Sequence, residues 1–98
     1  MNTKQFAKIM KALSNEKRLF LFNEIAKRQK SNYEEHECIV SNIIGFLKLT
    51  PPTISHHLKE LSNADLIKTE KKGKFLVASI NIETLESLKN FISSMLGQ

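Results

Sequence analysis

Apolar residues near the N-terminus recur at the spacing of an α-helix. Four of them fall at i, i+3, i+4 and i+7, which predicts a helix over residues 3–13. They are Phe6, Ile9, Met10 and Leu13. Lys4, Lys8 and Lys11 lie off this apolar stripe, as expected for a helix that buries one side only.

A second helix is predicted over about residues 16–30, after the favourable capping residues Ser14 and Asn15. Apolar residues lie nearly all round it, which is typical of the buried centre of a small domain. They are Leu19, Phe20, Leu21, Phe22, Ile25 and Ala26.

The middle of the chain predicts a helix-turn-helix over about residues 39–63. Residues 31–37 are polar and acidic and are expected to form a loop. Helical spacing of apolar residues then indicates a third helix, and a fourth helix follows after about three residues. Thr50 is a favourable N-cap for this fourth helix, and Pro51 suits its first position because no N–H is needed there.

The pattern changes after residue 65 to two strand-like runs, residues 66–71 and 75–80, with Lys72-Gly73 as the turn between them. A last helix with one apolar side is expected over residues 82–96. The chain is therefore predicted to be mainly α with a small β-hairpin, in the order α-α-α-α-β-β-α. This order is that of a winged helix-turn-helix, with the wing at about 66–80.

Composition narrows the class of protein further. A chain of 98 residues has room for a single domain. The net charge of +5 favours a polyanionic partner, with a solvated Lys-rich surface as the alternative. No apolar run approaches the roughly 18 residues that span a bilayer, so no membrane partner is expected. The single cysteine, Cys38, cannot form an intramolecular disulfide, which fits a cytoplasmic location.

Three strings along the chain resemble a known family. They are Lys-Ala-Leu-Ser-Asn-Glu-Lys-Arg-Leu at 11–19, Thr-Ile-Ser-His-His-Leu-Lys-Glu-Leu at 53–61, and Asn-Ala-Asp-Leu-Ile at 63–67. They are similar to the first helices, the recognition helix and the following turn of the arsenical-resistance repressor family (ArsR, or ArsR/SmtB). The resemblance covers about residues 6–81. It implies a dimeric transcriptional regulator that binds operator DNA, often under the control of metal ions or other small signals.

The fourth helix supplies the first candidate DNA contacts. At 100° per residue, Ile54, Leu58 and Leu61 point inward, and a polar stripe points outward. His57 lies beside the apolar face and is expected to be packed. Hydroxyl, imidazole and ammonium groups suit base edges and phosphates in a major groove. The candidates are Thr50, Thr53, Ser55, His56 and Lys59.

Two residues of this helix depart from the family pattern. Pro51 and Pro52 stand where the family often has polar residues, and proline has no N–H donor. Base recognition is therefore expected to depend on the neighbouring hydroxyl and imidazole groups.

Lysines of the predicted wing are the second set of candidates. They are positioned to reach phosphates beside the groove and to add affinity rather than sequence discrimination. The alternative is a hairpin edge that lysines protect from aggregation. These residues are Lys68, Lys71, Lys72 and Lys74.

No metal site and no cofactor are predicted. The resembling family binds metal through a Cys-x-Cys pair at the third helix, and the aligned positions here are Ile39 and Ser41. A second family site uses acidic and His ligands on the last helix, which has two glutamates here and no His. A metal- or thiol-responsive sensor that uses His36 and Cys38 stays open as an alternative.

An enzyme is not expected, because Ser55 and His56 point about 100° apart on a helix and no carboxylate is placed to orient them.

The apolar stripes of residues 3–13 and 82–96 exceed what one thin domain covers, which favours a homodimer through the terminal helices. The sequence thus predicts a homodimeric, sequence-specific regulator, as a repressor, on an inverted-repeat operator of double-stranded DNA. A winged-helix adaptor that binds protein is the other alternative. No effector is identified by these patterns.

Overall fold

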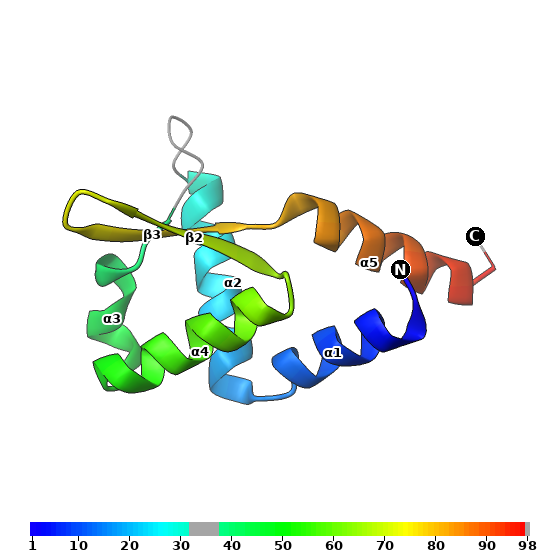
Figure 1. Ribbon diagram of the computed structural model, residues 1–98, viewed down its shortest axis with the longest axis horizontal. Helices are drawn as coiled ribbons and strands as arrows, with labels where there is room; N and C mark the ends of the chain where they lie inside the picture. The colour runs from blue at the N-terminus through cyan, green and yellow to red at the C-terminus, as the bar shows by residue number, and fades with distance from the viewer. Residues whose placement is uncertain (32–37, 98) are drawn as a thin grey trace.

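The computed structural model describes residues 1–31 and 38–97 (Figure 1). Its elements follow the predicted order, with one short strand added before the third helix. They are α1 (Thr3–Leu13), α2 (Glu16–Ser31), β1 (Cys38–Ile39), α3 (Ser41–Leu47), α4 (Pro51–Asn63), β2 (Ile67–Lys72), β3 (Phe75–Ile80) and α5 (Ile82–Met95). The winged helix-turn-helix predicted from the sequence is confirmed.

The core is built around α2, which packs against α1, α4 and the sheet. Leu21 and Ile25 of α2 are fully buried, together with Ile43, Leu61 and Leu66 from the surrounding elements. The expectation that α2 is buried all round is wrong. Leu19 and Phe20 are nearly half exposed, because neighbouring elements cover only one side of the helix.

The sheet has three strands in the order β1-β3-β2, all antiparallel. The strand β1 was not predicted, since two residues carry no alternation and depend on pairing with β3. The turn is Gly73-Lys74 and not Lys72-Gly73, because Lys72 pairs with Phe75. Gly73 has a φ of 62°, so it takes the first central position of the turn, where a positive φ favours glycine.

The helix-turn-helix is made by α3, a three-residue turn and α4. Lys48 ends α3 in the left-handed conformation, with a φ of 54°, and this reverses the chain direction. Pro51 occupies the first turn of α4, as expected. Thr50 is the N-cap residue, but its side chain does not cap the helix, contrary to the expectation.

The two terminal helices lie at one end of the molecule, and the wing tip and the start of α4 lie at the other (Figure 1). The molecule measures 44 × 29 × 20 Å. Asn81 caps α5 by accepting a hydrogen bond from the Thr84 N–H at 3.3 Å. Among the helices of the described residues, none is both long and apolar enough to cross a membrane.

Candidate nucleic-acid interface

The outer face of α4 is exposed along its length. Ile54, Leu58 and Leu61 anchor the helix in the core, as predicted. On the opposite side Ser55, His56 and Lys59 are exposed. Because these three side chains project from a helix whose inner face is fixed, they form a preorganised polar surface that is free to enter a groove.

The first turn of α4 has an unusual set of hydrogen-bond donors. Pro51 and Pro52 contribute no N–H, so two of the donors that a helix normally presents at its start are absent. The Thr50 and Thr53 hydroxyl groups lie 2.9 Å apart and hydrogen-bond to each other. Two facts explain why the Thr50 side chain does not cap the helix. Its hydroxyl group is paired with Thr53, and one usual target of a cap, the N–H of the second helical residue, does not exist on Pro52.

His57 lies on the inner side of α4 and is 5% exposed, as the sequence indicated. Its Nδ1 has no hydrogen-bond partner among the described residues. Burial lowers the pKa of His57 below 6.5, and the positive charges of Arg18, His56 and Lys17 lower it further. The charged form is therefore disfavoured, and the imidazole packs inside the protein rather than on the exposed face of α4.

Arg18 fixes the junction of α1 and α2 beneath this helix. Its Nε–H donates to the Ala12 carbonyl at the end of α1. Asn15 caps α2 by accepting the Arg18 backbone N–H at 3.0 Å. The two hydrogen bonds set the angle between α1 and the core.

The four wing lysines do not share one face of the hairpin. Lys68 pairs with Ser79, Lys71 with Leu76, and Lys72 with Phe75. Since successive side chains of a strand alternate, Lys68 and Lys72 lie on one face and Lys71 on the other. Lys74 stands in the turn, with its Nζ 5.4 Å from the centre of the Phe75 ring. This division follows from the alternation of side chains along β2, which the sequence analysis did not apply to the wing lysines.

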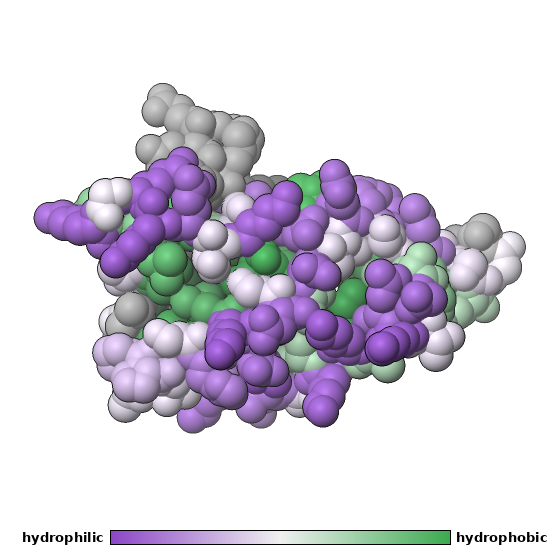
Figure 2. Space-filling view, in the orientation of Figure 1, coloured by the Kyte–Doolittle hydropathy of each residue, from purple (hydrophilic) through white to green (hydrophobic). Residues whose placement is uncertain are grey.

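A shallow groove of about 220 Å³ separates the wing from the helix-turn-helix. Figure 2 shows apolar surface in the hollow between the wing and the helices below it. The groove is lined by residues of both sides: Val40, Ser41, Pro51, Ile54, Ser55, Leu58, Lys74, Phe75 and Leu76. The start of α4 and the wing thus form one continuous surface that is apolar at its centre and cationic at its edge.

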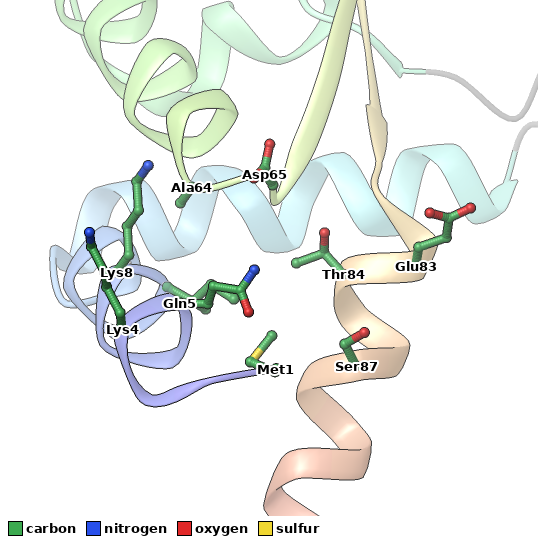
Figure 3. Close-up of a pocket in the computed structure, with 10 residues that line it drawn as sticks. Met1, Lys4, Gln5, Lys8, Ala64, Asp65, Glu83, Thr84 and Ser87 are labelled. Carbon is green, nitrogen blue, oxygen red and sulfur yellow. The ribbon is translucent and has the colours of Figure 1, made fainter.

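A second cleft, of about 460 Å³, lies between α1, the end of α4 and α5 (Figure 3). Gln5 and Met1 face Thr84 across it, while the Glu83 carboxylate points away. The cleft shows that α5 closes only loosely on α1; the two helices meet further along, where the Phe6 and Phe91 rings are 4.7 Å apart.

Metal-ligating side chains do not gather in the described part of the chain. Within residues 1–31 and 38–97 no group of three or more His, Cys, Asp or Glu is placed to hold a metal ion. His36 lies outside the described residues. Cys38 belongs to β1, where its backbone pairs with Ala78.

Comparisons with known proteins agree with this architecture. Residues 34–69 match the family model described as bacterial regulatory protein, arsR family. The uncharacterized HTH-type transcriptional regulator YbzH of Bacillus subtilis is 34% identical over 94 residues, which cover 88% of this chain and 93% of that protein. The arsenical resistance operon repressor of Bacillus subtilis is 29% identical over 85 residues, covering 87% and 74%.

A solved structure shares the fold. It is the homodimeric winged helix-turn-helix DNA-binding domain of Mb0332 from Mycobacterium bovis, with a TM-score of 0.69 and 22% identity, over 96% of this chain and 80% of that one. The fold and its relatives define a winged helix-turn-helix transcriptional regulator. The chain belongs to the arsR family of bacterial regulatory proteins. Because the family consists of regulators, the prediction that the protein is not an enzyme is confirmed.

The structure brings most of the predicted contact residues to one end of the molecule. Those of α4 share an outer face or its flank, and the wing tip lies above the same end (Figure 1). Lys68 is the exception, because it pairs next to the base of the hairpin. The exposed Pro51 and Pro52 join this surface.

Proposed function

We propose that this protein is a homodimeric, sequence-specific DNA-binding regulator that represses transcription by occupying an inverted-repeat operator. The observation that carries the proposal is the outer face of α4, where Ser55, His56 and Lys59 are exposed beside a lysine-bearing wing. A helix of this kind fits the major groove of B-DNA, and its side chains match base edges and phosphates.

The two parts of the surface divide the task of binding. Ser55 and His56 contact base edges. Thr50 and Thr53 flank them at the start of α4. Lys59 and the wing lysines Lys71, Lys72 and Lys74 contact phosphates, whereas Lys68, next to the base of the hairpin, contributes little. Phosphate contacts supply affinity that falls with salt, whereas base contacts supply discrimination between sequences.

The terminal helices support the homodimer. The helix α5 is amphipathic and 14 residues long, yet none of its residues is fully buried. Ile92, Met95 and Leu96 are 43%, 62% and 70% exposed, and Met10 of α1 is 39% exposed. A second copy of the same helices would bury these apolar side chains around a two-fold axis. The similar domain of Mb0332 is described as homodimeric.

A two-fold dimer predicts a two-fold operator. Two equivalent α4 helices enter major grooves on one side of the duplex, so the half-sites form an inverted repeat about one helical turn, or a multiple of it, apart. Repression follows if the operator overlaps a promoter, and one relative is named a repressor. A DNA partner of this kind supports a cytoplasmic location.

Selection of bound duplexes from a random DNA pool tests the proposal directly. The expected result is a converged inverted repeat, bound with steep salt dependence by a dimer. A Ser55→Ala/His56→Ala variant should lose the preference for the selected sequence while keeping weak binding to random duplex. A winged-helix protein adaptor would show no convergence and no salt-dependent binding, and this outcome would overturn the proposal.

A further inference from the structure

We propose that the start of α4 selects thymine, by packing Pro52 and Pro51 against the 5-methyl groups that thymine presents in the major groove. This inference rests on the proposed function and adds to it a base preference and the residues responsible. At the start of α4, apolar contact with the base takes the place of hydrogen bonds to the base edge.

The geometry places Pro52 on the surface that faces the groove. At 100° per residue, Pro52 lies on the outward stripe of α4 with His56 at i+4 and Lys59 at i+7, and all three are exposed. The N-terminal end of a recognition helix is the part that contacts base edges. Pro52 is thus the first outward-facing residue at that end.

Pro51 extends the apolar surface toward the wing. It is exposed and lines the groove that Phe75 and Leu76 close from the other side. Phe75 is 44% and Leu76 36% exposed. Lysines at the rim of this surface, Lys59 and Lys74, are exposed and suit the phosphates on either side. An apolar centre with a cationic rim fits a duplex that offers methyl groups between phosphates.

The polar groups of this corner are poorly placed to read bases by hydrogen bonding. Pro51 and Pro52 have no N–H, and the Thr50 and Thr53 hydroxyl groups use one of their two hydrogens on each other. A helix start that lacks these donors is also a weak site for phosphate. What remains at the start of α4 is one hydroxyl hydrogen and the exposed hydrocarbon of two proline rings.

Thymine is the base that such a tip distinguishes. Its methyl is the apolar group on the major-groove edge of the standard bases, and apolar side chains contact it in protein–DNA complexes. Removing one buried methyl-sized group lowers affinity about fourfold, from the typical value for a buried CH₂. Two equivalent half-sites bring the expected loss to about fifteenfold.

The experiment uses the selected operator and a duplex in which deoxyuridine replaces thymine. This exchange removes the methyl group and keeps the O4 acceptor and the base pair. The wild-type protein should bind the uracil duplex about fifteenfold more weakly, with one thymine read in each half-site. A Pro51→Ser/Pro52→Ser variant should bind both duplexes equally; Ser is acceptable in the first turn of a helix, and circular dichroism checks its fold. The matched control, Lys59→Ala, should bind more weakly and keep the ratio.

The outcomes separate this inference from the proposed function. Equal binding of thymine and uracil operators by the wild-type protein overturns the thymine contact and leaves operator binding intact. An undiminished ratio in the double Ser variant assigns the methyl contact to other residues and also overturns it. Failure of any sequence to be selected overturns operator binding itself.

Discussion

The two faces of the wing should contribute unequally to DNA binding. Lys71 lies on the same face of β2 as Ile67, which is buried in the core with Leu58 of α4, so Lys71 lies on the side of the recognition helix. Lys68 pairs with Ser79 and lies on the opposite face. We therefore expect Lys71→Ala to remove a phosphate contact and Lys68→Ala to leave binding nearly unchanged. Both substitutions remove one positive charge from the same strand, so Lys68→Ala is the matched control.

The size of the effect follows from the number of wings. A dimer carries two, so Lys71→Ala removes two phosphate contacts. Each contact contributes about 0.9 to the slope of log K against log salt concentration, so the slope should fall by about 1.8. Between about 50 and 200 mM salt, the wild-type protein should then lose roughly tenfold more affinity than the variant does.

Fluorescence anisotropy of a labelled operator across this salt range measures the slope. Circular dichroism establishes that each variant is folded. Equal slopes for Lys71→Ala and Lys68→Ala would show that net charge, and not the face of the hairpin, determines the contact. An unchanged slope for Lys71→Ala would show that Lys71 makes no phosphate contact.

Four further predictions concern single residues. His56→Ala should weaken operator binding more than Lys72→Ala does and leave random-duplex binding nearly intact; equal losses in both assays would contradict this division of roles. Ile92→Glu should convert the dimer to a folded monomer in analytical ultracentrifugation, because it places a charge in an apolar contact. Because burial lowers the pKa of His57 below 6.5, the unfolded chain binds a proton at a higher pH than the folded protein does. The free energy of unfolding should therefore fall as the pH drops below about 6.5 and be steady above it. Denaturant melts of His57→Gln should lack this pH dependence. Gln29→Ala leaves the buried Ile80 N–H without the 2.7 Å acceptor and should cost about 1–3 kcal/mol in urea denaturation, with a smaller loss for Gln29→Glu.

The helices were predictable wherever a local pattern determines them. The boundaries of α1 and α4 match the prediction, because apolar spacing and caps or proline act within one or two turns. The exposure of Leu19 and Phe20 was not predictable from spacing, since the identity of the covering elements is a tertiary property. The Gln29–Ile80 hydrogen bond joins residues 51 positions apart and has no local signature.

The candidate interface was predictable on the helix and less so on the wing. The period of 100° was sufficient to separate the inward Leu58 from the outward His56, and the burial of His57 followed from the same geometry. Alternation along β2 is sufficient to place Lys68 and Lys71 on opposite faces, but which of the two faces turns toward α4 depends on tertiary packing.

In the proposed dimer, α5 is connected closely to the recognition helix α4, so the packing of α5 determines the distance between the two half-sites. A single residue, Asn81, separates β3 from α5; its side chain caps the helix, and its N–H donates to the Leu66 carbonyl at 3.0 Å. Leu66 is fully buried between α4 and β2. Wing, recognition helix and α5 are thus joined through short, hydrogen-bonded segments without a flexible linker. A rotation of one α5 against the other would therefore move the recognition helices and wings of both subunits. A signal that repacks the α5 helices would change operator affinity without contacting the DNA-binding residues.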